Sequence, residues 1–174
     1  DMSERQEAEA ELKLSLLEKE VLLKELYHRT KNNMNLISSL MSLQSLTTGD
    51  EKLVNAFRDM QHRIQAMALV HERLYKSSDL NKIDMAHYVK DLTGSLMLSF
   101  GAKSRNIDLK LDIEELPTII DLAIPCGLII NELMTNAMKY AFVDGAPGQI
   151  SVTLRTLPEN KLELGFADNG RGLP

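Results

Sequence analysis

Several residue types are scarce in this sequence of 174 residues. A single cysteine, Cys126, cannot form an internal disulfide, so nothing indicates an oxidising compartment. No apolar run approaches the roughly 20 residues of a membrane-spanning helix, and no signal-peptide pattern opens the chain. Tryptophan is absent and aromatic residues make up 5%, which fits helix packing better than an all-β sandwich. We therefore expect a cytoplasmic protein with no membrane contact in this segment.

An excess of positive charge is also missing. The formal net charge is −5, which argues against a general binder of nucleic acids or of anionic membranes. Hydrophobic residues at 44% and charged residues at 26% are ordinary for a globular protein. The length leaves room for one or two domains.

Glycine and proline are absent from residues 3–46, which predicts one long helix. Gly49 ends this pattern, and Asp50 is placed to cap a second helix over residues 51–76. Apolar side chains of the second helix recur at spacings of four and three: Leu53, Phe57, Met60, Ile64, Met67, His71 and Leu74. Two helices joined by a short turn form an antiparallel hairpin. We expect two copies to bury these stripes in a homodimeric four-helix bundle.

The rest of the sequence alternates between helical and strand patterns. After a polar connector at 77–81, we expect a helix at 83–103, a strand at 107–113, a helix from Pro125 to Phe142, a loop at 143–148 and paired strands at 150–154 and 162–166. This order predicts an α+β unit, with helices on one face of a mixed or antiparallel sheet. The expected division is a hairpin domain at 1–80 and an α+β domain at 81–174.

His28 lies in the run ELYHRTKNN at residues 25–33 of the first helix. If Leu26 and Leu40 occupy heptad position d, His28 falls at f, the position farthest from the helix seam. A solvated imidazole is largely neutral at pH 7 and offers a nucleophilic nitrogen. A core histidine would occupy a or d, so burial does not explain this residue.

The other histidines and the cysteine have simpler interpretations. His71 falls on the apolar stripe of the second helix and is expected to be a packing residue. His62 and His87 are expected at the surface, and Cys126 is expected to be a small buried residue.

Polar side chains gather on one stripe of the helix after Pro125: Glu132, Asn136, Lys139 and Tyr140. Such a stripe suits a nucleotide phosphate, because Asn136 offers an oxygen to Mg²⁺, Lys139 neutralises charge, and Glu132 orients water or the metal. The alternative is an ordinary solvated helix face.

The run DNGRG at 168–172 follows the last expected strand. Asp168 can accept a hydrogen bond from an amine, and the glycines let the backbone approach a flat ligand. The alternative is an ordinary tight turn. The two segments could face each other across one pocket, and their joint presence is stronger than either alone.

Four segments resemble a known family. The run NELMTNAMKYAF at 131–142 resembles the N-box of the GHKL ATPase superfamily, and DNGRGLP at 168–174 resembles its G1 box. Residues 25–33, followed by ISSL at 37–40, resemble the phosphoacceptor box of the HisKA_2 group of sensor histidine kinases. ALVHERLY at 68–75 resembles that group's second helix. The resemblance implies a dimeric helical hairpin followed by a partial GHKL (Bergerat-type) α/β sandwich.

The resemblance also implies a function. His28 would accept the γ-phosphoryl group of ATP and pass it to an aspartate of a response-regulator receiver domain. The implied nucleotide-site residues are Glu132 supporting metal-bound water, Asn136 on Mg²⁺, Lys139 on phosphate, Asp168 on the adenine amine, and Tyr140, Gly170 and Gly172 lining the site. Lys24, Arg29 and Lys31 would dock the receiver. Residues 1–5 resemble the last turn of a PAS sensor domain, which implies a sensor upstream.

Two departures from the family pattern stand out. Many histidine kinases carry an acidic proton acceptor directly after the phosphoacceptor, where this chain has Arg29. Glu25, one turn earlier, is a candidate substitute that could also merely tune His28, and Asn32 is a hydrogen-bonding alternative. The chain stops at Pro174, so the resemblance implies that the glycine-rich lid is absent and that this chain binds ATP weakly or not at all.

Two other functions compete with the kinase interpretation. A non-catalytic histidine phosphotransfer or scaffold protein would keep the hairpin but lose the nucleotide. A GHKL ATPase of the chaperone, gyrase or mismatch-repair type would leave an exposed histidine on a bundle helix without a role.

Overall fold

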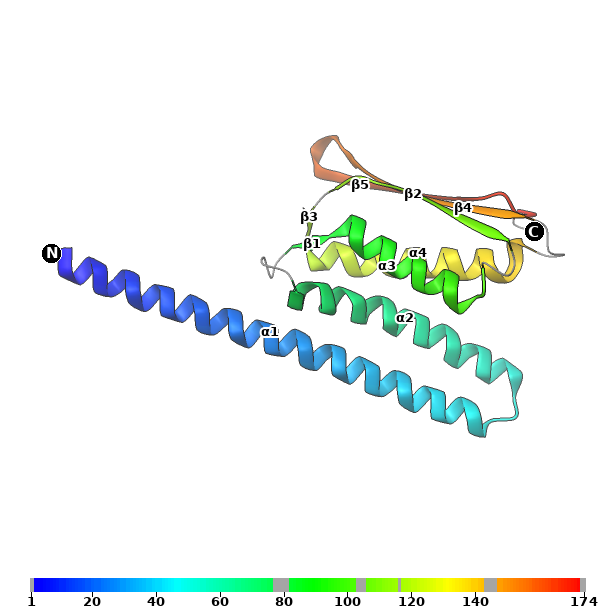
Figure 1. Cartoon of the computed structure of the whole chain (residues 1–174), viewed down its shortest axis with the longest axis horizontal. Coiled ribbons are helices and arrows are strands. Elements are labelled where there is room, and N and C mark those ends of the chain that lie inside the picture. Colours follow the sequence, from blue (N-terminus) through cyan, green and yellow to red (C-terminus); the bar gives the residue numbers. More distant parts are fainter. Residues whose placement is uncertain (1, 77–81, 103–105, 116, 143–146, 173–174) are drawn as a thin grey trace.

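The computed structural model describes residues 2–76, 82–102, 106–115, 117–142 and 147–172, and Figure 1 shows their arrangement in layers. The long helix α1 (Met2–Thr47) and the antiparallel helix α2 (Glu51–Lys76) form a hairpin. Helix α2 lies between α1 and a second layer of helices, α3 (Met85–Ser99) and α4 (Ile120–Asn136). A sheet covers the far side of this second layer. The fold is α+β, as predicted.

The sheet is mixed, which is one of the two predicted alternatives. Strand β4 (Gly148–Leu157) lies in the centre, parallel to β2 (Ile107–Ile113) and antiparallel to β5 (Lys161–Asp168). A 3-10 turn at Pro158–Asn160 joins β4 to β5. The bridge between β1 (Ile83–Asp84) and β3 (Pro117–Thr118) is too short to leave a sequence pattern and was not predicted.

The hairpin turn forms where the sequence predicts it. The Lys52 backbone N–H donates to the Asp50 carboxylate at 2.8 Å, so Asp50 caps α2 as expected. Asp84 caps α3 in the same way, accepting from the His87 N–H at 3.0 Å. This cap explains why α3 begins at Met85 rather than at Ile83. The predicted connector at 77–81 and most of the loop at 143–148 lie outside the described residues.

The start of α4 corrects the prediction. The helix begins at Ile120, not at Pro125, because the Leu122 and Ala123 N–H groups both donate to the Ile119 carbonyl at 3.1 Å. Pro125 lies inside the helix with its ring exposed, where it costs one backbone hydrogen bond. The predicted end near Phe142 is close, since α4 continues as a π-helical turn over Ala137–Ala141.

Helix α1 turns two different faces to its surroundings. The half-buried face toward α2 is formed by Tyr27, Lys31, Met34, Ser38, Met41 and Ser45. The predicted seam positions Leu26, Ile37 and Leu40 instead remain exposed. The apolar seam of α1 therefore points away from the α2 of the same chain, as a surface that pairs with another helix would.

Helix α2 buries a face that includes Leu74 of the predicted apolar stripe, together with Ala66 and Val70, which the stripe did not include. Ala66, Val70 and Leu74 are fully buried in one core that includes α3, α4 and the sheet. Gly127 of α4 is needed for this packing, because a Cβ there would lie 1.7 Å from the Tyr88 hydroxyl. That hydroxyl donates to the Ala66 carbonyl at 3.1 Å. The core is thus continuous across the expected domain boundary near residue 80.

His62 corrects a second prediction. It was expected at the surface, yet it is buried on the same face of α2, where its Nε2 lies 2.8 Å from the Ser99 hydroxyl and its ring packs on Phe100. The prediction failed because small residues on this face left no apolar stripe. None of the helices within the described ranges combines the length and apolar character needed to cross a membrane.

Candidate functional site

His28 is exposed, as its heptad position predicts, but it does not stand apart from α2. Its ring lies 5.5 Å from the ring of Tyr75 at an interplanar angle of 41°. One turn earlier on α2, the ring of His71 lies 5.8 Å from the ring of Tyr27 on α1. Two aromatic contacts between α1 and α2 therefore hold the imidazole at the edge of the hairpin, where a reactant from solvent can reach it.

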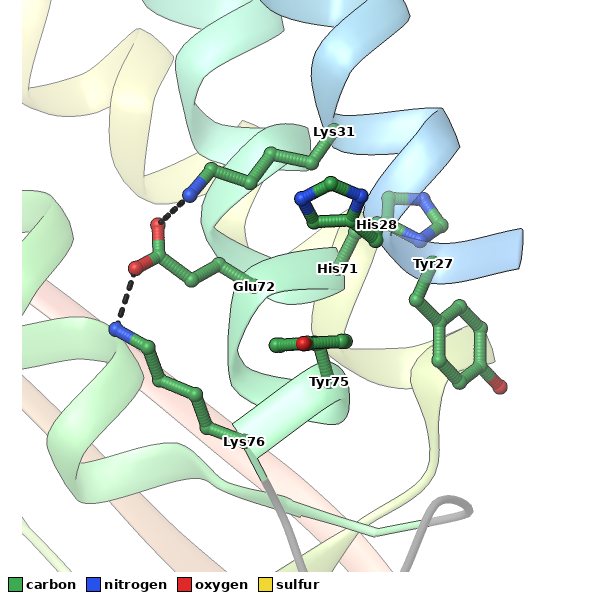
Figure 2. A pocket seen from close by; sticks show the side chains of 7 residues that line it. All are labelled: Tyr27, His28, Lys31, His71, Glu72, Tyr75 and Lys76. Carbon is green, nitrogen blue, oxygen red and sulfur yellow. Dashed lines mark hydrogen bonds and ion pairs between the residues drawn. The ribbon is translucent and has the colours of Figure 1, made fainter. Parts of the chain in front are cut away.

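The groove between the two helices at this level holds a cavity of about 190 Å³ (Figure 2). Its lining comes from α1 and α2 alone: Tyr27, His28, Lys31, His71, Glu72, Tyr75 and Lys76. Glu72 and Lys76 were not singled out in the sequence. Their spacing of four on one helix face was the only signal that could have found them.

The Asn32 amide is the hydrogen-bonding neighbour of the His28 ring. Its Nδ2 lies 3.4 Å from the His28 Nδ1. Rotating an amide by 180° exchanges its nitrogen and oxygen. The Asn32 side chain can therefore also accept a hydrogen bond from an N–H group at the His28 Nδ1. In that tautomer Nε2 carries the free lone pair of the ring.

Glu25 lies on the same exposed face but is directed to another partner. Its carboxylate accepts from the Arg29 guanidinium at 2.6 Å. This hydrogen bond and the Arg29 charge lower the pKa of Glu25, and the nearby His28 adds a smaller effect in the same direction. Glu25 is therefore an ionised group beside His28 whose nearest cation is Arg29.

The predicted nucleotide stripe lies on α4 and on the π-helical turn after it. Asn136 and Tyr140 are exposed, while Glu132 and Lys139 are half-buried. Lys139 and Tyr140 both lie in the π-helical turn, a rare conformation that is frequent at functional sites.

Two ion pairs connect this stripe to α2. The Arg63 guanidinium donates to both carboxylate oxygens of Glu132, at 2.5 and 3.0 Å. Lys139 Nζ lies 2.5 and 2.7 Å from the two oxygens of Asp59. Hydrogen bonding to Glu132 raises the pKa of Arg63. Neither partner on α2 was predicted, since each pair joins residues far apart in the sequence.

The two predicted nucleotide segments meet in the structure. The Arg171 N–H donates to the Ala141 carbonyl at 3.1 Å, and a Cβ at Gly170 would lie 2.5 Å from the Ala141 Cβ. Asp168 accepts from the Gly170 N–H at 2.9 Å, which orients its carboxylate at the turn. Gly172 has a φ of +78°, which favours glycine. Leu173 and Pro174, the end of the G1-like run, lie outside the described residues.

His28 and the nucleotide stripe are well separated along α2. His28 contacts Tyr75, whereas Lys139 contacts Asp59, sixteen positions earlier on the same helix. At 1.5 Å per residue this corresponds to about 24 Å. The structure therefore brings the N-box-like and G1-like segments together, but it does not bring them to His28.

The other two histidines of the sequence analysis and the cysteine make contacts that fit structural roles. Burial lowers the pKa of His71, which is half-buried against Tyr27 as a packing residue, and its Nδ1 has no hydrogen-bond partner in the described part of the chain. His87 is exposed and lies 2.6 Å from Asp84 through its Nδ1. Cys126 is half-buried rather than buried, and burial raises the pKa of its thiol.

Comparison with protein families identifies the hairpin. Residues 25–100 match the HisKA_2 family model, which is described as histidine kinase. The matched segment contains His28, the whole of α2 and α3.

Two curated relatives extend the similarity over most of the chain. It is 26% identical over 157 residues to blue-light-activated histidine kinase 2 of Erythrobacter litoralis, covering 87% of this chain and 44% of that protein. It is 28% identical over 165 residues to sensor histidine kinase PdtaS of Mycolicibacterium smegmatis, covering 92% of this chain and 32% of that protein. The chain thus spans less than half the length of these relatives.

Solved structures show the same fold. The histidine kinase domain of the blue-light activated histidine kinase from Erythrobacter litoralis matches with a TM-score of 0.61 at 18% identity, over 90% of this chain and 74% of that one. A longer structure of that kinase matches with a TM-score of 0.63 at 22% identity, over 87% of this chain and 45% of that one. The chain thus shares the fold of these histidine kinase structures, a helical hairpin followed by a small α+β unit with a mixed sheet.

Proposed function

Since residues 25–100 belong to the HisKA_2 family of histidine kinases, we propose that this chain transfers the γ-phosphoryl group of ATP to His28. The phosphoryl group would then pass to an aspartate of a response-regulator receiver domain. The observation that carries the proposal is the exposed imidazole of His28 at the mouth of a cavity lined by cationic side chains.

The transfer step needs one free imidazole nitrogen. Its lone pair attacks the γ-phosphorus, the bond from phosphorus to the β,γ-bridging oxygen breaks, and ADP leaves with that electron pair. The phosphorylated ring then loses its remaining proton to a base or to water. Such transfers depend mainly on positioning and on neutralisation of charge.

Asn32 is the better supported partner for the ring proton. It lies 3.4 Å from the His28 Nδ1, whereas the Glu25 carboxylate is bonded to Arg29. With the amide oxygen turned to Nδ1, Asn32 holds the tautomer whose Nε2 is nucleophilic. Glu25, kept ionised by Arg29, would stabilise the positive charge that develops on the ring.

The residues on α4 have the chemistry that Mg²⁺ and ATP require. The exposed Asn136 offers a carboxamide oxygen to the metal, one turn from the Glu132 carboxylate, and Lys139 offers an ammonium to phosphate. Bound Mg²⁺ would neutralise charge on the phosphates. Asp168, whose carboxylate is oriented by Gly170, would accept a hydrogen bond from the adenine amine.

We propose that the arrangement described here is the closed one. Arg63 and Asp59 engage Glu132 and Lys139, and the stripe lies about 24 Å from His28 along α2. Transfer therefore requires that these pairs separate, that the buried contacts of Ala66 and Val70 with the α+β unit open, and that the unit at 81–174 move along the hairpin at 1–80. The two predicted domains are the moving parts.

A homodimer is part of the proposal. Apolar side chains at seam positions of α1 remain exposed in one chain: Leu16, Leu23, Leu26, Ile37 and Leu40. A second hairpin packed on this seam would bury them and complete a four-helix bundle. Input from a PAS-like sensor preceding α1 would reach the site through the same helix.

The receiver would approach the outer edge of the hairpin. Lys24 and Arg29 are exposed on either side of His28, and Leu43 lies exposed further along α1. A cytoplasmic location, where receivers and ATP are available, belongs to this proposal.

A non-catalytic phosphotransfer protein is the second candidate. The engagement of Glu132 and Lys139 by α2 favours it, because these groups are then closed to nucleotide. The exposed Asn136 and the contact between the N-box-like and G1-like segments favour the kinase.

Labelling with γ-³²P ATP and Mg²⁺ separates the two candidates, using the protein in its full natural length. The kinase predicts an acid-labile, alkali-stable label that is lost in His28→Gln and retained in the matched control His87→Gln. Absence of label, combined with uptake of phosphoryl from a phosphorylated receiver, would establish the phosphotransfer function instead.

A further inference from the structure

The cavity beside His28 contains an ordered set of three charges. Lys31 Nζ of α1 lies 3.0 Å from one carboxylate oxygen of Glu72, and Lys76 Nζ lies 2.6 Å from the other (Figure 2). One carboxylate of α2 therefore holds two ammonium groups, one from each helix of the hairpin. All three side chains line the same cavity as the imidazole.

The set is ionised and partly sheltered from water. Hydrogen bonds from Lys76 and Lys31 lower the pKa of Glu72, so its carboxylate is charged at neutral pH. The side chains of Lys31 and Glu72 are 31% and 28% exposed, while that of Lys76 is 64% exposed. Lys31 is thus a partly sheltered wall of the cavity, and Lys76 is a more exposed cation at its rim.

The net charge of the set suits an incoming dianion. Two lysines and one glutamate leave a charge of +1 beside the nucleophile. A phosphoryl group carries about −1.5 to −2 at neutral pH and has three acceptor oxygens. It can replace Glu72 as the acceptor for both ammonium groups. An ion pair that only joined α1 to α2 would need Lys31 and Glu72 but not Lys76. Joining the two helices therefore does not explain Lys76.

We propose that Lys31 and Lys76 bind the phosphoryl group carried by His28, and that Glu72 is a positioning residue that holds both lysines in place beforehand. The proposal rests on the proposed function only in making His28 the phosphorylated residue. It assigns three residues that the nucleotide site does not include.

A test that uses no ATP keeps the two proposals separable. Phosphoramidate phosphorylates exposed histidines directly: an imidazole nitrogen attacks phosphorus, the phosphorus–nitrogen bond of the reagent breaks, and ammonia leaves, taking up the proton that the ring releases. In the full chain, His28 and His87 are both exposed. Their ³¹P NMR signals are assigned with His28→Gln and His87→Gln, and each is followed through the titration of its phosphoryl group.

Lysine and glutamate variants should move the His28 titration in opposite directions. Removing the cations in the Lys31→Met, Lys76→Met double variant raises the pH midpoint by about half a unit or more, because the dianion loses two partners. Glu72→Gln lowers the midpoint, because glutamine keeps a side-chain oxygen that can hold the two lysines while the neighbouring negative charge is removed. Changes of opposite sign cannot come from a general loss of structure.

The control signal is in the same spectrum. The His87 midpoint stays fixed in all these variants, and Lys52→Met, at the far end of α2, leaves both midpoints unchanged. An unchanged His28 midpoint in the double lysine variant would overturn the proposal. So would failure of His28 to accept the phosphoryl group under conditions in which His87 accepts it.

Discussion

Lys139 of the π-helical turn is held by both carboxylate oxygens of Asp59 on α2, at 2.5 and 2.7 Å. A residue proposed to bind ATP phosphate is thus engaged by α2, the helix that packs against α1, on which the proposed phosphoacceptor His28 lies. The Arg63–Glu132 pair makes the same connection one turn further along α2 and about two turns back along α4. In the proposed function, nucleotide binding and the packing of α2 on α4 would therefore compete for the same side chains.

Removing the charge of Asp59 or Arg63 on α2 should increase the affinity of the chain for ATP. Asp59→Asn and Arg63→Gln each remove one competing ion pair of about 1 kcal/mol or less, so each should tighten ATP binding about two- to fivefold. Binding of a fluorescent ATP analogue in the presence of Mg²⁺ measures the change. Arg58→Gln is the matched control, because Arg58 bonds to Asn55 of its own helix. Equal affinity in all three variants would mean that the closed arrangement does not restrain the site.

We predict that Asn32 and Glu25 make separable contributions at His28. If Asn32 holds the productive tautomer, Asn32→Ala should slow phosphorylation about tenfold, the worth of one hydrogen bond. Glu25→Gln keeps the shape of the side chain and removes only its charge, so its effect should be smaller. Single-turnover rates at saturating ATP provide the comparison. The opposite ranking would identify Glu25 as the base.

The exposed seam of α1 predicts a dimer that a single charge can disrupt. Leu40 occupies a seam position and is 53% exposed in one chain, whereas Leu46 is 82% exposed outside the seam. Leu40→Glu should place a buried charge in the dimer and shift it to monomer. Leu46→Glu should leave the dimer intact. Light scattering coupled to size-exclusion chromatography reads out both masses, and equal masses for the two variants would argue against this seam.

His62 should make stability depend on pH. Burial lowers its pKa, Asp59 opposes this effect, and Lys139 and Arg58 add to it. The folded protein then holds His62 neutral at pH values where the unfolded chain binds a proton, so the free energy of unfolding decreases as pH falls below about 6.5. Each such proton contributes at most about 1.4 kcal/mol per pH unit.

Urea unfolding between pH 7.5 and 5 tests this dependence. His62→Gln should flatten it in part, because burial also lowers the pKa of His71. A curve for His62→Gln that coincides with that of the unsubstituted protein would count against a neutral buried imidazole.

The sequence predicts local structure well where a local signal exists. The bounds of α2 and β2 agree with the predicted ranges, because Asp50 caps the helix and strict alternation marks the strand. The start of α4 was predicted too late, at Pro125, because proline usually marks the first turn of a helix. His62 was misplaced because alanines on the buried face of α2 give no apolar stripe.

The site could be predicted in its residues but not in its arrangement. His28 and the α4 stripe carry recognisable motifs, whereas Asp59 and Arg63 lie in none. Glu72 lies in the run at 68–75, but its pairing with Lys31 follows only from contacts across the fold. Packing of α2 on α4 is a tertiary property, and it alone decides how far the stripe lies from His28.

Locating the phosphoryl group on the chain tests the central claim most directly. After incubation of the full-length protein with ATP and Mg²⁺, peptides prepared without acid are sequenced by mass spectrometry. Phosphorylation of His28, with His62, His71 and His87 unmodified, is the predicted result. Phosphate on a hydroxyl side chain or on another histidine, with His28 unmodified, would contradict the account.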